Sequence, residues 1–196
     1  MLMFQQAEFV DRNELGNFLN KKGLKGRAVE VGTHRGDFAF EFLQTWEGKL
    51  LTCIDPWENL PEYLAQSKLL WGNGNREEDF QHCQRILEPF QGQVEFLRST
   101  SPKAAQEFHN ESLDFVYIDG DHSRMAVLKD LHAWWPKLRK GGILAGHDIV
   151  CPGESLEENW GLEIQPSVIE FAEFYKSTIF LIVEMKCLPW SYYFVK

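Results

Sequence analysis

Residues 27–41 read Arg27-Ala-Val-Glu-Val-Gly-Thr-His-Arg-Gly-Asp-Phe-Ala-Phe-Glu41, and they decide the fold of this chain. The apolar run 28–31 predicts a buried parallel strand, the stretch from Gly32 to Gly36 predicts a tight turn, and a helical pattern resumes at Phe38. Such a junction directs backbone N–H groups and the positive end of a helix dipole into one crevice, where glycines leave room for a ligand. We therefore expect a small ligand with an anionic end at this turn.

The glycine spacing separates two kinds of cofactor. Dinucleotide sites read G-x-G-x-x-G, whereas this turn reads Gly32-x-x-x-Gly36, which disfavours a nicotinamide-dependent dehydrogenase. The pattern of Glu30, Gly32 and Gly36 instead resembles the first motif of class I methyltransferases, which bind S-adenosylmethionine. A glycine turn after a strand also occurs for structural reasons alone, so this motif gains its weight from the residues that follow it.

Length and composition favour one globular domain. The chain has 196 residues, of which 44% are hydrophobic, so we expect a single domain over residues 1–196 with a full core. The formal charge of -9 disfavours nucleic acid as a partner, because phosphate contacts need clustered Lys and Arg. The four cysteines lack C-x-x-C spacing, which favours reduced thiols over disulfides or a zinc site. No secretory pattern or long apolar stretch is found, so we expect a cytoplasmic protein without membrane contact.

Strands and helices alternate along the chain. The predicted strands span residues 28–31, 50–54, 94–97, 113–118 and 141–145, and the predicted helices span 37–46, 77–87, 102–108, 125–138 and 166–175. Within residues 1–22 we expect a covering helix with Asp11 as its N-cap and Gly23 as its stop, and residues 178–183 and 191–195 are expected to form an edge hairpin. This alternation predicts an α/β fold with a parallel sheet, helices on both faces and ligands at the carboxyl ends of the strands.

Polar residues lie where the second and third strands end. Asp55 is positioned to accept hydrogen bonds from the two hydroxyls of a ribose, with a helix cap or strand-end turn as the alternative. Trp57 is a candidate to stack on adenine or, alternatively, to pack in the core. Ser99 and Thr100 are candidates to face the adenine, whereas Ser101 is the better candidate for a helix N-cap. The long connection 57–76 is expected to be a lid or substrate loop, with a helical part at 61–70.

Acidic residues and histidines follow the fourth and fifth strands. Asp119 and His122 come after the strand at 113–118, and His147 and Asp148 come after the strand at 141–145. Carboxylates together with an imidazole suit a divalent cation such as Mg²⁺ or Mn²⁺, which lowers the pKa of a bound hydroxyl. His122 is the candidate base for the proton of that hydroxyl. The alternative is that the aspartates are turn residues and the histidines are satisfied locally.

Two blocks carry the most specific resemblance. Tyr117-Ile-Asp-Gly-Asp-His-Ser123 and Gly141-Gly-Ile-Leu-Ala-Gly-His-Asp148 resemble the methyltransferase family 24 group of class I S-adenosylmethionine-dependent methyltransferases, which are relatives of catechol O-methyltransferase. The resemblance covers about residues 25–195. It implies a three-layer Rossmann-like fold whose seven-stranded sheet is mostly parallel with an antiparallel edge strand.

The resemblance also implies roles for individual residues. The residues that it places at the methionine portion of the cofactor are Glu30, Gly32 and Gly36, and Thr33 of the same turn is a further candidate for cofactor binding. It places Asp55 at the ribose and Asp119 beside the cofactor, and it assigns Mg²⁺ to Asp119, His147 and Asp148. His122 stands where the catechol-type enzymes have their catalytic lysine. Two residues depart from the family pattern, namely His147 in the usual carboxylate pair and Arg124 in place of a tyrosine.

The sequence therefore predicts transfer of a methyl group from S-adenosylmethionine to an oxygen of a small-molecule acceptor, assisted by a divalent cation or by His122. Two alternatives stay open. One is a metal-free N- or O-methyltransferase in which Asp119 and Asp148 only shape the pocket, and the other is a non-catalytic S-adenosylmethionine-binding partner of a second enzyme. The tryptophans of the 57–71 loop favour an aromatic acceptor. The candidate residues for a homodimer face are Trp190, Tyr192 and Tyr193.

Overall fold

A computed structural model describes residues 4–60, 75–149, 163–183 and 190–196 of the chain. The strands are β1 (Phe4–Gln6), β2 (Arg27–Val31), β3 (Leu50–Asp55), β4 (Val94–Arg98), β5 (Leu113–Ile118), β6 (Leu138–Ile149), β7 (Ile179–Ile182) and β8 (Trp190–Val195). The α-helices are α1 (Leu15–Lys21), α2 (Asp37–Leu43), α4 (Arg76–Leu87), α5 (Ser101–Ala104), α6 (Arg124–Trp134) and α7 (Ile164–Tyr175). The 3₁₀ helices are η1 (Arg12–Glu14), η2 (Glu88–Phe90), η3 (Ala105–Glu107) and η4 (Trp135–Lys137).

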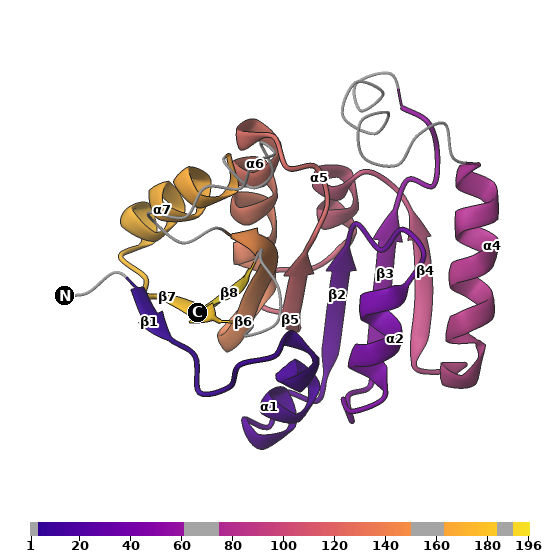
Figure 1. Cartoon of the computed structure of the whole chain (residues 1–196), viewed down its shortest axis with the longest axis horizontal. Coiled ribbons are helices and arrows are strands. Elements are labelled where there is room, and N and C mark those ends of the chain that lie inside the picture. Colours follow the sequence, from indigo (N-terminus) through magenta and orange to yellow (C-terminus); the bar gives the residue numbers. More distant parts are fainter. Residues whose placement is uncertain (1–3, 61–74, 150–162, 184–189) are drawn as a thin grey trace.

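The described part of the chain forms one sheet of eight strands in the order β1-β7-β8-β6-β5-β2-β3-β4 (Figure 1). Strand β8 runs antiparallel to both of its neighbours, β6 and β7, near one edge of the sheet, and every other pairing is parallel. This confirms the predicted α/β fold with a mostly parallel sheet. The count exceeds the seven strands implied by the resemblance because β1 adds an eighth strand beside β7.

Residues 4–6, which precede the predicted N-cap at Asp11, form a strand that the sequence analysis did not predict. These residues pair in parallel with β7, from Phe4 opposite Ile179 to Gln6 opposite Leu181, so they complete the backbone hydrogen bonds of a strand that would otherwise be an open edge. The helical segment begins only at Arg12. As predicted, Asp11 caps it by accepting the N–H of Asn13 at 2.9 Å, and Gly23 follows its end at a φ of +71°.

Apolar side chains alternate between the two faces of the sheet and build two cores. Helices α1, α2 and α4 cover one face, and α5, α6 and α7 cover the other (Figure 1). On the first face the ring of Phe38, in the first turn of α2, stacks on Tyr117 of β5 with centroids 3.7 Å apart. This contact ties the turn that follows β2 to the end of β5, where the candidate site lies.

Helix α6 is shorter and β6 longer than predicted. The predicted helix at 125–138 ends at Trp134 and gives way to the 3₁₀ turn η4, because Pro136 has no backbone N–H to continue the α-helical pattern. Strand β6 begins directly afterwards at Leu138 and extends to Ile149, beyond both ends of the predicted 141–145. His147 and Asp148 therefore belong to the strand itself and do not lie in a loop after it.

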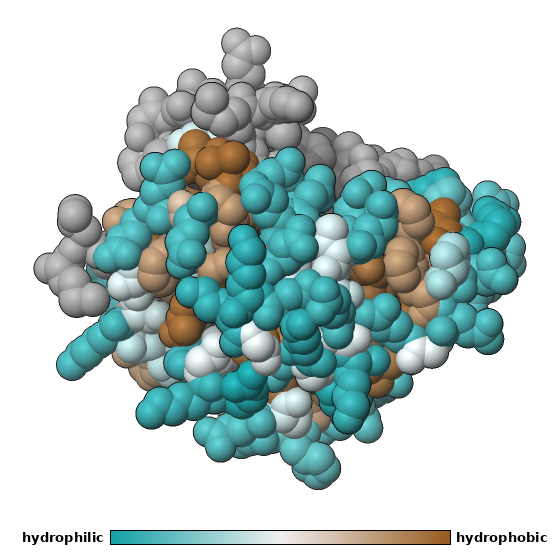
Figure 2. All heavy atoms as spheres, turned by 90° about the horizontal axis from the view of Figure 1, so that it is seen from below, coloured by the Kyte–Doolittle hydropathy of each residue, from teal (hydrophilic) through white to brown (hydrophobic). Residues whose placement is uncertain are grey.

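The exposure of side chains is relevant to the predicted homodimer face and to membrane contact. Tyr192 and Tyr193 are buried within this chain, with exposed fractions of 1% and 2%, whereas Trp190 is partly exposed, and a homodimer stays a prediction. On the face shown in Figure 2, hydrophilic side chains predominate and hydrophobic ones form small separate groups. No helix within the described residues has the length and apolar character needed to cross a bilayer. Cys53 and Cys83 are buried free thiols, as expected.

Some predicted features lie outside the described residues. They are most of the lid or substrate loop with its helical part at 61–70, the segment 150–162 after β6, the hairpin turn at 186–189, and the cysteines Cys151 and Cys187.

Candidate active site

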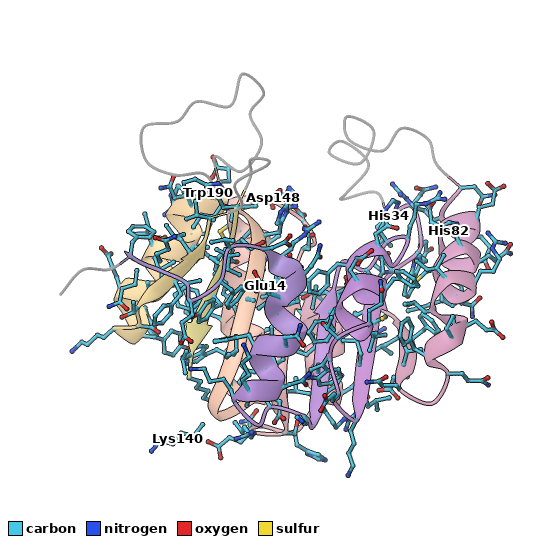
Figure 3. The ribbon with its side chains drawn as sticks, turned by 60° about the horizontal axis from the view of Figure 1, so that its bottom comes forward. Glu14, His34, His82, Lys140, Asp148 and Trp190 are labelled. Carbon is cyan, nitrogen blue, oxygen red and sulfur yellow. The ribbon has the colours of Figure 1, made fainter. Side chains whose placement is uncertain are left out.

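Three strand ends that are far apart in the sequence open onto one edge of the sheet. The N–H of Gly32 donates to Ile54 on β3 at 2.8 Å, and the N–H of Asp119 donates to Val31 on β2 at 2.8 Å. Figure 3 shows His34 and Asp148 at this edge and Lys140 at the opposite one. The glycine turn, Asp55 and Asp119 therefore lie at the same end of the sheet, because the carboxyl ends of parallel strands meet there.

The backbone conformation and the neighbouring protein atoms allow only glycine at position 32. Its φ is +85°, a conformation that disfavours other residues, and a Cβ on it would overlap the backbone carbonyl of Asp119. Gly36 also has a φ of +85°, and a Cβ there would lie 2.8 Å from the sulfur of Cys83. The missing Cβ atoms thus let the end of β2 pack closely on the end of β5, and the start of α2 on α4, which adds a structural reason to the predicted space for a ligand.

Glu30 is an acid with no partner for one of its oxygens. Its side chain points to the α1–α2–α4 face, is 2% exposed, and its Oε2 has no hydrogen-bond partner among the described residues. Burial raises the pKa of Glu30 to about 8, and the charges of Asp119 and Asp55 add to this effect. Buried polar atoms are rarely left unpaired in proteins. An unpaired carboxyl oxygen beside the glycine turn is therefore suited to a positively charged ligand group.

Asp55 ends β3 as predicted and also holds the turn that follows β2. Its Oδ2 accepts the backbone N–H of His34 at 3.0 Å, and its Oδ1 accepts the backbone N–H of Trp57 at 2.7 Å. Burial raises the pKa of Asp55, although these two hydrogen bonds oppose the rise. Each carboxylate oxygen can accept a second hydrogen bond, so Asp55 fits both the predicted ribose contact and the turn-forming alternative.

Trp57 packs in the core and does not present an open face for adenine. It is 2% exposed, its indole N–H donates to the carbonyl of His34 at 2.7 Å, and its ring lies 4.6 Å from that of Phe80. The packing alternative is therefore the correct one. The indole ring can be buried here because its N–H, the only polar group of the side chain, makes a hydrogen bond.

The end of β4 differs from the expectation at Ser101. Ser99 and Thr100 follow β4 beside Asp55, and Ser99 donates its N–H to the Asp55 carbonyl at 3.2 Å. Thr100 is the N-cap residue of α5, whereas the hydroxyl of Ser101 accepts the indole N–H of Trp134 at 2.9 Å. The prediction of Ser101 as N-cap is thus wrong, because α6 packs on α5 and takes its hydroxyl as a partner.

A compact group of ionisable side chains lies at the ends of β5 and β6. His122 Nε2 lies 3.2 Å from Oδ2 of Asp148 and 3.6 Å from Oδ1 of Asp119. His147 Nδ1 lies 2.9 Å from the other oxygen of Asp148. Asp148 thus has one imidazole on each carboxylate oxygen. Ligand atoms of Asp119, His122 and Asp148 all lie within 4.8 Å of one another, which is compatible with a shared cation.

This arrangement changes the predicted metal set. We expected Asp119, His147 and Asp148, but His147 is turned toward Asp148 and His122 takes its place in the cluster. The cause is an extra residue in β6: its pairing with β8 shifts between Gly146 and Ile149, and Asp148 adopts a φ of +60°. Such a bulge redirects side chains at a strand end. His147 and Asp148 are therefore not equivalent ligands.

Within this cluster the carboxylates favour protonation of His122, and the histidines favour ionisation of Asp148. Burial lowers the pKa of His122, but the hydrogen bond to Asp119 and the charges of Asp148 and Asp121 outweigh it and raise the pKa above its usual value. Burial raises the pKa of Asp148, but His147 and His122 outweigh it and hold the pKa below its usual value. A small pocket beside the cluster is lined by residues of five elements, including Asp119, His122, His147, Ile164 and Tyr192.

The family follows from comparison with known proteins. A family model described as "Methyltransferase domain", of methyltransferase family 24, matches residues 29–149. The chain belongs to this methyltransferase family. The matched residues run from β2 to the end of β6, so they include every cofactor and metal position predicted above. This confirms the class I methyltransferase resemblance that the sequence motifs indicated.

Relatives of this methyltransferase are distant. Uncharacterized protein y4gI of Sinorhizobium fredii is 31% identical over 129 residues, which make up 62% of this chain and 13% of that protein. The chain therefore spans only a small part of the length of this curated relative. Among solved structures, an O-methyltransferase of Bacillus cereus in complex with SAH has a TM-score of 0.65 at 17% identity, covering 94% of this chain and 80% of its own.

A second solved structure is similar to this chain to the same degree. The O-methyltransferase TomG of Streptomyces achromogenes, in complex with SAM, has a TM-score of 0.65 at 14% identity and covers 94% of this chain and 78% of its own. At this level of identity the likeness concerns the fold alone. The fold of this methyltransferase is therefore the Rossmann-like one that the sequence predicted.

Sequence reasoning missed the residues that support the methyltransferase site from a distance. Asp79 of α4 is buried and lies 3.3 Å from Nε2 of His34, 3.2 Å from Arg35 and 3.3 Å from Arg76. These contacts join α4 to the turn that carries Gly32 and Gly36. The i, i+3 spacing of Arg76 and Asp79 was the one local signal, and it does not reveal the contacts to the turn.

Proposed function

We propose that this methyltransferase transfers the methyl group of S-adenosylmethionine to an oxygen of a small-molecule acceptor, with His122 as the base. The observation that supports this most is the contact of 3.2 Å between His122 Nε2 and Asp148, beside the pocket at the ends of β5 and β6. When bound, S-adenosylmethionine supplies an electrophilic methyl group on a sulfonium and leaves as S-adenosylhomocysteine.

The residues at this edge fit the cofactor. Glu30 has a buried carboxyl oxygen without a partner, Asp55 retains acceptor capacity for a ribose, and Ser99 and Thr100 lie beside it. The adenosyl part would thus lie toward β3 and β4, and the amino-acid part toward β2 and β5. Asp119 and His122 would then be the residues on the acceptor side of the cofactor.

The role of His122 follows from its contacts. Asp148 accepts from Nε2, so Nε2 carries a proton and Nδ1 is the nitrogen that can accept one. The acceptor oxygen gives its proton to Nδ1 as it forms a bond to the methyl carbon, and the imidazolium that results is stabilised by Asp119 and Asp148. His147 holds Asp148 in place from the other side. The remaining contribution is orientation of acceptor and methyl group.

A divalent cation is the second candidate for activating the acceptor. The two carboxylates and one imidazole of Asp119, His122 and Asp148 form a donor set that suits Mg²⁺ or Mn²⁺, and their ligand atoms are close enough to share an ion. A cation held there would lower the pKa of an acceptor hydroxyl. It would also compete with the proton on His122, so the two modes of activation are alternatives at one cluster.

A turnover assay tests the proposal. Purified protein is incubated with S-adenosylmethionine and panels of phenol, sugar and amine acceptors, and S-adenosylhomocysteine is quantified with chelator and with added Mg²⁺. We expect turnover of a hydroxyl acceptor in chelator and a loss of about 10²- to 10⁴-fold in kcat for His122→Ala. The exposed His109 serves as the control, through His109→Ala.

Each other result has a definite meaning. Activity only with Mg²⁺ would show that the cation, and not His122, activates the acceptor. Turnover of amines alone would show that the acceptor atom is nitrogen and not oxygen. Tight S-adenosylhomocysteine binding without turnover of any acceptor would favour a non-catalytic binding partner.

A further inference from the structure

The N-terminal segment brings a cation to the methionine end of the predicted crevice. Arg12 begins the 3₁₀ helix η1, which Asp11 caps, and its Nη1 donates to the hydroxyl of Tyr117 at 3.4 Å. Tyr117 lies on β5, two residues before Asp119, and its ring stacks on Phe38 at the start of α2. Arg12 therefore contacts a residue near the end of β5, although it precedes the residues that the family model matches.

Arg12 and Glu30 have one neighbour in common, Tyr117. Glu30 and Tyr117 are direct partners in the pairing of β2 with β5, so the side chain that contacts Arg12 is the neighbour of the unpaired Glu30 carboxyl. Adjacent strands lie about 4.8 Å apart. Glu30 and Arg12 are thus both neighbours of Tyr117, at the end of the sheet where the cofactor is proposed to bind.

An acid and a guanidinium together match the two charges of an amino acid. A carboxylate accepts hydrogen bonds from an α-ammonium group, and a guanidinium binds an α-carboxylate with two parallel hydrogen bonds. We propose that Arg12 binds the α-carboxylate of the methionine portion of S-adenosylmethionine while Glu30 receives its α-ammonium group. This inference rests on the proposed function for the identity of the cofactor, and it adds a binding residue from outside the matched family region.

Calorimetry with three ligands tests the proposal on the whole chain. S-adenosylhomocysteine has both charged groups, decarboxylated S-adenosylhomocysteine lacks only the carboxylate, and 5′-methylthioadenosine lacks the whole amino-acid part. We expect wild-type protein to bind the first at least about tenfold more tightly than the second, and Arg12→Met to abolish that preference. Binding of 5′-methylthioadenosine should change less than about twofold, because it makes no contact with Arg12.

Two further variants serve as controls. Arg12→Lys keeps the charge but loses the two parallel hydrogen bonds, so it should restore part of the preference for the carboxylate. Arg85→Met removes an exposed arginine near the C-terminal end of α4 and should leave all three affinities unchanged.

The outcomes separate this inference from the proposed function. If wild-type protein shows no preference between S-adenosylhomocysteine and its decarboxylated form, or if Arg12→Met weakens all three ligands equally, the assignment of Arg12 is overturned and its role is structural. If wild-type protein binds none of the three, the proposed cofactor itself is wrong. The comparison of ligands on wild-type protein holds even if Arg12→Met does not fold.

Discussion

His122 Nε2 lies 3.2 Å from Oδ2 of Asp148, and this contact joins the end of β5 to the end of β6. Asp148 reaches that position because β6 carries an extra residue opposite β8 and because its own backbone adopts a φ of +60°. A residue other than glycine in this conformation is uncommon and costs energy, and such strain is concentrated at functional sites. If His122 is the base, as we propose, this contact occupies Nε2 and leaves Nδ1 to accept the proton.

The pH dependence of turnover should report this contact. His122 must be neutral to accept a proton, and its pKa is raised, so kcat/KM should rise with pH along a limb centred above 6.5. Asp148→Asn removes one of the charges that raise the pKa, so the limb should move to lower pH even though the maximal rate falls. Asp121→Asn should shift it less, because Asp121 has the weakest effect on His122. A limb that stays in place in Asp148→Asn would show that another group titrates.

Glu30 should make the stability of the ligand-free protein decrease with pH. Its pKa is 4.5 in the unfolded chain and about 8 in the fold, so the folded state retains the proton more strongly and stability is lost as pH rises between these values. The loss should approach about 1.4 kcal/mol per pH unit over part of this range. Glu30→Gln removes the titration, so its advantage over wild type in urea unfolding should grow from pH 5 to pH 8.5. The exposed Glu107, changed to Gln, should retain the wild-type slope, and an equal slope in Glu30→Gln would contradict the assigned pKa.

Asp55→Ala should weaken S-adenosylhomocysteine binding. Loss of charge-assisted hydrogen bonds to a ribose costs about 1.5–3 kcal/mol, which corresponds to about 10- to 150-fold in Kd. Asp55 also holds the N–H groups of His34 and Trp57, so melting temperature is measured in parallel. Asp114→Ala is the matched control: it too removes a carboxylate that accepts a backbone N–H, that of Gly26, but at the opposite edge of the sheet. Equal loss of affinity in both variants would assign the effect to stability alone.

Gly32→Ala should disrupt the junction of β2 with β5. A methyl group there meets the backbone carbonyl of Asp119, which belongs to a paired strand end and cannot move aside easily. Gly92 has a similar φ of +92° and open space around it, so Gly92→Ala isolates the conformational cost of about 1–2 kcal/mol. We expect Gly32→Ala to lose more stability than Gly92→Ala and also to weaken S-adenosylhomocysteine binding. Urea unfolding and calorimetry measure both, and similar losses in the two variants would refute the steric argument.

Local patterns predicted most of the fold. The strand 113–118 was located with its exact ends because a continuous apolar run between polar turns has one simple interpretation. The turn at Gly32 and the acid at Asp55 were located because they mark the carboxyl ends of strands. Features that depend on partners distant in the sequence were missed or predicted wrongly, as shown by the pairing of residues 4–6 with β7 and by the bond between Ser101 and Trp134.

The sequence by itself determined the alternation of strands and helices, the glycine turn and the choice of carboxylates and histidines at the strand ends, because hydrophobic periodicity and backbone sterics act over a few neighbouring residues. Only the tertiary structure decided which histidine joins Asp119 and Asp148, and that Arg12 reaches Tyr117. These contacts depend on a bulge in β6 and on the path of the N-terminal segment, which are set by packing between elements that the chain brings together only when the whole sheet has formed.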